Sequence, residues 1–281
     1  MPPLGEIALG WLTLRSSEPL PLIEAAAAGG FGSVGMKLAP RPGEDPVMLC
    51  EDALFRRQVR GSLERNGVGV FNIGSLWLDG EREAGMFRPA IEAGVELGGR
   101  RAIAISIDPE PGRRTDQLGR LAALCGEYEI ELAIEFFAYS SIGSLEEAVA
   151  MTRAVNADNL TILVDALHFA RSGGTVEQLA AIPPGRLGWF QLCDAPARHP
   201  GIEGLSFEGG KDRLDPGEGG LPLAAWLRAL PHGTRIEVEI PRLASQGLSA
   251  RERGIEVAAR VRDYLQEQGK RREGTIHEDR R

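Results

Sequence analysis

The feature that most constrains the fold is an alternation, repeated eight times, between a short apolar segment and a longer amphipathic one. The apolar segments are rich in Ile, Val and Phe and are mostly bounded by Gly, Asp, Asn or Pro, which is typical of β-strands. We expect strands at residues 6–11, 33–38, 68–74, 101–107, 131–137, 160–166, 187–193 and 235–241. The amphipathic segments, expected to be helices, include residues 21–30, 86–99, 115–130, 144–155, 221–231 and 250–268.

Apolar strands that alternate with helices predict a parallel sheet covered by those helices. Eight such units in 281 residues fit an α/β fold with a single (β/α)8 TIM barrel, because such barrels commonly have about 250 residues. We expect the barrel to span residues 1–268 and the charged segment 269–281, which lacks an apolar period, to be disordered. Residues 194–220 form a long Gly/Pro-rich connection after the seventh strand, and a loop of that length is usually functional.

Charge and composition exclude several classes of protein. The net charge of −8 argues against nucleic-acid binding, which requires a basic face. No apolar run approaches the length of a membrane span, and the first residues lack the pattern of a secretory signal. The three scattered cysteines Cys50, Cys125 and Cys193 are typical of reduced thiols. We therefore expect a cytoplasmic protein that acts on a small molecule.

Oxygen-bearing side chains recur near the ends of the last four predicted strands. Alternate residues of a barrel strand point inward, and active sites of barrels form where the strands end. In each of these strands one polar residue shares a face with a residue two positions earlier: Ala133 with Glu135, Leu163 with Asp165, Trp189 with Gln191, and Glu237 with Glu239. We expect Glu135, Asp165, Gln191 and Glu239 to converge on one half of the barrel mouth.

Three carboxylates brought together repel one another, and burial adds several kcal/mol per group unless a cation compensates. One divalent ion bound by Glu135, Asp165, Gln191 and Glu239 meets this requirement. Because all four ligands are oxygens, the set favours Mn²⁺ or Mg²⁺, with Co²⁺ or Zn²⁺ as alternatives.

Around these positions the sequence resembles the xylose isomerase-like TIM barrel superfamily of sugar and sugar phosphate isomerases and epimerases. The matching segments are IEFF at 134–137, LVDALHF at 163–169, FQLCDAP at 190–196, LDPGEGGLPL at 214–223 and VEIP at 238–241. The resemblance implies one divalent ion on Glu135, Asp165, Gln191 and Glu239, although the third ligand of the family is often His. It also implies that Glu135 and Glu239 form the acid/base pair, and that the protein forms dimers or tetramers.

Other residues have roles that only the resemblance implies. His168, in an Asp-x-x-His motif, Arg198 and Glu218 are expected to bind or shape the site for the substrate. Trp11 and Trp77 follow the first and third strands, where core packing is favoured over contact with a sugar. Lys37 and Arg213 are considered as anion contacts on loops.

The expected function is isomerisation or epimerisation of a sugar or related polyhydroxy carbonyl compound by proton transfer through a metal-stabilised enediolate. Gln191 followed by Asp-Ala-Pro is also similar to the bacterial 3-dehydroshikimate dehydratases, so a dehydratase of the dehydroshikimate or inosose type remains an alternative. A non-catalytic sugar-binding barrel is the third reading. The apurinic-site endonuclease branch is disfavoured because four histidines are too few for its three zinc ions.

Overall fold

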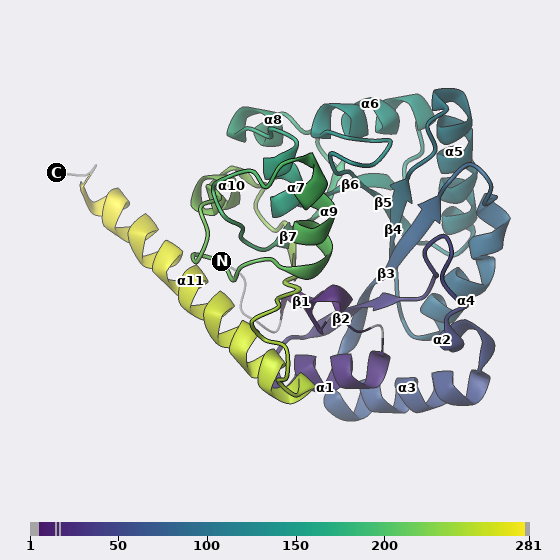
Figure 1. Ribbon diagram of the computed structural model, residues 1–281, viewed down its shortest axis with the longest axis horizontal. Helices are drawn as coiled ribbons and strands as arrows, with labels where there is room; N and C mark the ends of the chain where they lie inside the picture. Colours follow the sequence, from purple (N-terminus) through teal and green to yellow (C-terminus); the bar gives the residue numbers. More distant parts are fainter. Residues whose placement is uncertain (1–5, 15, 17, 279–281) are drawn as a thin grey trace.

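The computed structural model describes residues 6–14, 16 and 18–278. In this part of the chain eight parallel strands form a closed barrel in sequence order, from β1 round to β8, which pairs with β1 (Figure 1). The single TIM barrel predicted from the sequence is therefore confirmed. The strands are β1 (Ala8–Leu9), β2 (Ser33–Lys37), β3 (Gly69–Leu78), β4 (Arg101–Ser106), β5 (Glu131–Glu135), β6 (Leu160–Asp165), β7 (Leu187–Leu192) and β8 (Arg235–Val238).

Helices surround the barrel and cover the outward faces of its strands (Figure 1). They are α1 (Pro19–Gly29), α2 (Met48–Glu51), α3 (Ala53–Asn66), α4 (Arg88–Glu96), α5 (Pro111–Glu127), α6 (Leu145–Val155), α7 (Ala166–Arg171), α8 (Val176–Ala180), α9 (Ile202–Lys211), α10 (Leu223–Ala229) and α11 (Ala250–Glu278). Two 3₁₀ helices, η2 (Trp11–Leu14) and η3 (Ala84–Phe87), follow β1 and β3.

Local sequence explains where several helices begin and end. α1 ends at Gly29, and the next residue, Gly30, adopts φ 81°, a left-handed conformation that glycine accepts without strain. The Ser144 hydroxyl accepts a hydrogen bond from the backbone N–H of Glu147 and so caps α6. The Glu147 carboxylate accepts from Gly143 N–H, one residue before the position that a complete capping box requires.

Two apolar cores lie on the two faces of the sheet. The larger one fills the space between the outward strand faces and the helices. The smaller one lies inside the barrel and consists of Ala8, Phe71, Ile103, Ile105, Ala133, Phe137, Leu163 and Trp189, with Trp77 against it. Ala133, Leu163 and Trp189 are the residues that the alternation predicted to face inward. The predicted alternation of inward and outward residues is thus confirmed. The polar residues two positions later on the same strands share the inward face, at the end where the barrel opens.

The long connection after β7 is more ordered than its composition suggested. Within the segment 194–220, residues Ile202–Lys211 form α9, and an antiparallel bridge joins Asp194 to Leu214. The expectation of a continuous loop is corrected here, because Leu205 and Glu208 of this helix are buried against the barrel.

The C-terminal helix α11 begins against α1 and then runs away from the barrel (Figure 1). It continues through much of the predicted charged tail, to Glu278, while residues 279–281 lie outside the described part. The domain boundary at residue 268 stays a prediction. Among the described helices, none combines the length and the apolar character that a bilayer-spanning segment requires.

Candidate active site at the barrel mouth

The four predicted oxygen donors are buried near the C-terminal ends of adjacent strands. Glu135 and Asp165 are the last residues of β5 and β6, Gln191 is the next-to-last residue of β7, and Glu239 directly follows β8. Glycine makes room for the last of them, because a Cβ on Gly10 would lie 3.1 Å from Glu239 Oε1. The strand ends therefore deliver these side chains to one side of the barrel.

A cavity of about 110 Å³ opens at this end of the barrel. Its polar lining includes Glu135, Gln191, Glu239, His168 and Arg213. Its aromatic lining comes from Trp11, Trp77, Phe137 and Tyr139. Both tryptophans line the cavity, and each also packs against an apolar core as the sequence favoured, Trp11 against the larger core and Trp77 against the inner one.

Arg213 provides a buried positive charge among these acids. Its side chain is 1% exposed, and Nη1 donates to Asp165 Oδ2 at 2.6 Å and to the backbone oxygen of Glu239 at 3.2 Å. Its Nη2 lies 3.7 Å from Glu239 Oε2. Arg213 belongs to the connection after β7, so this segment supplies the positive charge that partly compensates the buried acids.

Burial and mutual repulsion shift the acids in different directions. Burial raises the pKa of Glu135 well above its usual range, and the charges of Glu239 and Asp165 add to this effect. Burial also raises the pKa of Glu239, while Arg213 acts in the opposite direction. For Asp165, burial is opposed by Arg213 and by the His168 N–H, and its pKa is lowered. Glu135 and Glu239 therefore resist ionisation more than Asp165 does.

His168 lies beside two of these acids. Asp165 caps α7 by accepting the backbone N–H of His168 at 2.9 Å, which fixes the start of the helix that carries the imidazole. The ring lies 5.0 Å from the Phe137 ring, and its Nε2 is 3.9 Å from Glu135 Oε1. Burial lowers the pKa of His168 to about 4, so the ring is neutral near pH 7.

Gln191 has an unusual hydrogen-bonding state. Its Nε2 donates to Glu237 Oε2 at 2.9 Å. Its Oε1 is buried and has no hydrogen-bond partner in the described part of the protein. An unpaired buried amide oxygen is costly, and a cation is one partner that would satisfy it.

The four side chains are of the types that a divalent ion takes as ligands. With Glu135, Asp165 and Glu239 ionised, the Arg213 guanidinium compensates one of the three negative charges and two remain. The free Gln191 oxygen supplies a neutral fourth donor. In the described residues, no three His, Cys, Asp or Glu side chains are close enough to hold an ion by themselves. Glu135, Asp165 and Glu239 would therefore have to move closer together around an ion, with the Gln191 oxygen as the fourth donor.

The other predicted substrate contacts lie outside this cavity. Arg198 is exposed beyond β7. Glu218 is also exposed, and its carboxylate pairs with Arg242 at 2.5 Å. Lys37 pairs with Glu44 at 2.5 Å, and its ammonium lies 5.4 Å from the Trp11 ring centroid. Of the three residues predicted to contact the substrate, the structure brings only His168 to the mouth.

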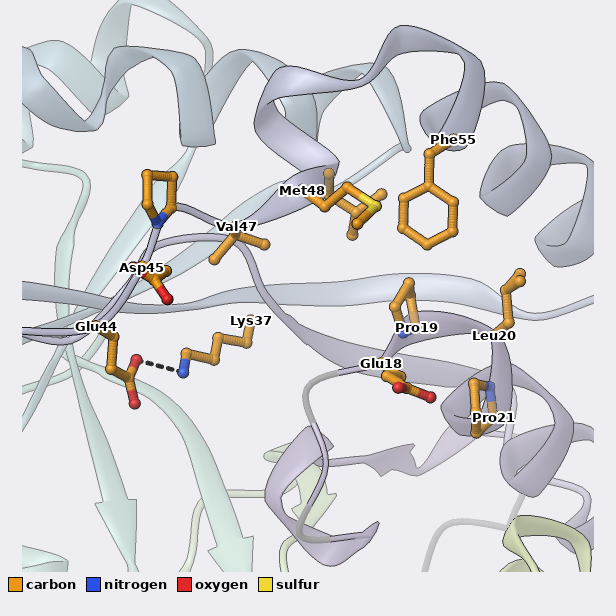
Figure 2. Close-up of a pocket in the computed structure, with 12 residues that line it drawn as sticks. Glu18, Pro19, Leu20, Pro21, Lys37, Glu44, Asp45, Val47, Met48 and Phe55 are labelled. Carbon is orange, nitrogen blue, oxygen red and sulfur yellow. Dashed lines mark hydrogen bonds and ion pairs between the residues drawn. The ribbon is translucent and has the colours of Figure 1, made fainter.

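A larger cavity, of about 610 Å³, lies beside α1 and α2. Figure 2 shows Met48 and Phe55 opposite Pro19 and Leu20, with the Lys37–Glu44 ion pair at the other end. None of the four strand-end donors lines it. Its walls are mostly apolar, and we assign the chemistry to the mouth cavity.

The sequence did not place three polar residues that lie at the mouth or directly below it. Arg213 was considered only on a loop surface, Arg41 was not considered, and Glu237 was noted only for its face. Arg41 lies in the mouth cavity, with its guanidinium 5.9 Å from the Trp11 ring centroid and 5.5 Å from that of Trp77. The inward parity of Glu237 was the one signal in the sequence that could have identified it.

Comparison with known proteins agrees with this architecture. Residues 23–265 match the model of a family described as xylose isomerase-like TIM barrel. Curated relatives include the inosose isomerase of Bacillus subtilis, 27% identical over 117 residues, covering 41% of this chain and 40% of the relative. The inosose isomerase of Bacillus licheniformis is 26% identical over 140 residues, covering 48% of this chain and 49% of the relative. The matches thus span half or less of those relatives' lengths.

Similar solved structures cover nearly the whole chain. The IolI protein with a bound zinc atom has a TM-score of 0.75 at 20% identity, covering 92% of this chain and 98% of that one. A D-psicose 3-epimerase determined in the presence of D-fructose has a TM-score of 0.69 at 16% identity, covering 90% and 96%. At these identities the likeness concerns the fold.

Proposed function

Because the chain belongs to the xylose isomerase-like TIM barrel family, we propose that it is a divalent-metal-dependent isomerase or epimerase of a sugar or related polyhydroxy carbonyl compound. The observation that carries the proposal is the buried, unpartnered Gln191 oxygen beside Glu135, Asp165 and Glu239. Glu135, Asp165, Gln191 and Glu239 would hold the ion, Mn²⁺ or Mg²⁺ by oxygen preference and Zn²⁺ or Co²⁺ as alternatives. The zinc atom described for the IolI neighbour keeps zinc among the candidates.

A divalent ion at this place supplies Lewis acidity, which stabilises the negative charge on substrate oxygens as an α-proton leaves. The protein's part is proton transfer by two carboxyl groups. Glu135 and Glu239 line the same cavity, and their raised pKa values suit groups that take and return protons. We propose that one removes the α-proton and the other returns it, giving an enediolate between the two transfers.

His168 and Arg213 orient the substrate and these acids. A neutral imidazole can donate a hydrogen bond to a substrate oxygen from one nitrogen and accept at the other. Arg213 holds Asp165 ionised and in place. The roles predicted for Arg198 and Glu218 would require the segment after β7 to move, since neither lines the cavity.

The substrate we propose is a small sugar or cyclic polyol ketone, in agreement with the inosose substrates that the names of the curated relatives imply. A cavity of about 110 Å³ limits the ligand to a small molecule. The same first proton transfer followed by loss of a β-hydroxyl would give a dehydratase. Gln191 favours that second reading through its resemblance to dehydratases.

Exchange of the substrate's α-proton with solvent, together with the product formed, distinguishes an isomerase or epimerase from a dehydratase. The protein is incubated with Mn²⁺ and an inosose in D₂O, and deuterium at the α-carbon is followed by NMR. We expect exchange without new ultraviolet absorbance. Absorbance from an enone product would replace the isomerase with the dehydratase, and no exchange with any of a panel of inososes and ketohexoses would contradict both.

A further inference from the structure

A fourth buried acid, Glu237, lies directly below the proposed metal ligands. It is 1% exposed and occupies β8 two residues before Glu239. The strand register places its Cα opposite that of Gln191 on β7 and that of Ala8 on β1. It does not line the mouth cavity, so it has no direct access to a substrate.

Side chains from two strands donate hydrogen bonds to this carboxyl group. Asn72 Nδ2 lies 2.9 Å from each of the two carboxyl oxygens. Trp189 Nε1 donates to Oε2 at 3.1 Å, and Gln191 Nε2 donates to the same oxygen at 2.9 Å. A Cβ on Gly35 would lie 2.4 Å from Glu237 Oε1, so a glycine on β2 leaves the space that the group fills. The surroundings of Glu237 therefore form a buried site that suits a hydrogen-bond acceptor.

This arrangement fixes the orientation of the Gln191 amide. The nitrogen and oxygen of an amide have nearly the same size, so only its hydrogen-bond partners decide which way it turns. The Trp189 N–H can only donate, so Glu237 Oε2 is an acceptor, and this oxygen therefore selects the amide nitrogen of Gln191. The amide oxygen is left pointing away from Glu237, buried and unpartnered.

We infer that Glu237 is a positioning residue that turns the Gln191 oxygen toward the divalent ion. The inference rests on the proposed metal site and extends it to a residue that touches neither ion nor substrate. Partners that orient a metal ligand typically change metal affinity by about 10- to 100-fold when they are mutated. Without Glu237 the amide rotates freely, and its N–H₂ group competes with its oxygen for the place beside the cation.

The test is a Mn²⁺ titration followed by electron paramagnetic resonance, which reports free Mn²⁺ without any substrate. We expect Glu237→Gln to weaken Mn²⁺ binding by about 10- to 100-fold relative to the wild type. Glu131→Gln serves as the matched control, because Glu131 lies at the opposite end of β5 and pairs there with Arg235. Its Mn²⁺ affinity should equal that of the wild type.

A charge swap separates positioning from general damage to the core. In the double variant Glu237→Gln/Gln191→Glu, the amide at 237 donates to the carboxylate at 191. The total charge stays constant and a carboxylate oxygen faces the ion, so binding should return to the wild-type level or exceed it. The double variant also serves as the test if Glu237→Gln alone does not fold.

Two results overturn the inference. One is a Glu237→Gln protein that binds Mn²⁺ as tightly as the wild type, which leaves the metal site itself standing. The other is a folded double variant that binds Mn²⁺ no better than Glu237→Gln does. If Glu237→Gln does not fold, the contradicting result is a folded double variant that fails to bind Mn²⁺. A wild-type protein that binds no Mn²⁺ contradicts the proposed metal-dependent function and this inference together.

Discussion

The side chains at the mouth form a set of buried charges whose balance depends on each neighbour. Glu135 and Glu239 resist ionisation, while Asp165 is held ionised by Arg213. Strand parity in the sequence was enough to identify the acids and Gln191. It could not identify their partners, because Arg213 reaches Asp165 from 48 residues away and only the folded chain shows that contact.

Replacing Glu239 by Gln should remove one member of the acid/base pair and preserve its shape. We expect α-proton exchange of an inosose in D₂O to fall by about 10²- to 10⁴-fold, the usual contribution of such a group. The melting temperature should stay at or above that of the wild type, because a buried like charge is lost. Exchange at the wild-type rate would remove Glu239 from the mechanism.

His168 should make the folded protein sensitive to acid. Its pKa in the folded state, about 4, lies below the ordinary value of 6.5, so the unfolded chain takes up the proton first. The stability it contributes is complete above about pH 6.5 and is lost as the pH falls toward 4. Between pH 7 and pH 5 the loss is about 2 kcal/mol.

Urea unfolding at both pH values measures this effect. We expect His168→Asn, which cannot take up a proton, to lose less stability than the wild type over the same interval. An equal loss in the two proteins would assign the acid sensitivity to other groups.

The elements that build the site differ in how well the sequence predicts them. All eight strands were predicted, because each is a continuous apolar segment with clear boundaries. The expected helices did not include α2, α3, α7, α8 or α9. Of the two longest of these, α3 is strongly charged and buries only Val59 and Leu63, and α9 lies in a Gly/Pro-rich segment. β8 ends at Val238, so Glu239 lies one residue beyond the paired strand, whereas the expected strand 235–241 included it.

The connection after β7 contributes to stability through Arg213. Replacing it by Met leaves Asp165 buried without its cation, and loss of one partner of a buried ion pair costs about 3–5 kcal/mol. Because Mn²⁺ supplies positive charge at the same place, it should recover part of this loss. Urea unfolding with and without Mn²⁺ provides the measurement.

Arg198→Met is the control for this loop, since Arg198 is exposed on the same connection. A substitution at such a surface position is expected to change stability by less than about 0.5 kcal/mol. If Arg213→Met were equally harmless, the buried pair would have no structural role.

For the chain as a whole, the fold was predictable because eight repeats of one supersecondary unit leave few architectures open. The reaction was less predictable than the fold, since a metal-assisted proton transfer is common to isomerases, epimerases and dehydratases. What distinguishes them is the shape of a small cavity, and its walls come from η2, β3, β4, β5, α7, β7, α9 and the segment after α9. Such long-range assembly leaves no local pattern in the sequence.

Bound metal should stabilise the entire barrel, because a ligand that binds only the folded state adds to its stability. We expect treatment with a chelator to lower the melting temperature and Mn²⁺ to restore it. At an ion concentration of about 100 times the dissociation constant the gain is about 2.7 kcal/mol. The Asp165→Asn/Glu239→Gln variant should show no response to Mn²⁺, and a response equal to that of the wild type would place the ion elsewhere.

The most direct test of the metal site is a crystal grown with Mn²⁺ and measured for anomalous scattering of manganese. We predict one peak per chain, within ligand distance of oxygens from Glu135, Asp165, Gln191 and Glu239. The Gln191 nitrogen should still be bonded to Glu237. A mouth without an anomalous peak, or a peak held by other residues, would contradict the account.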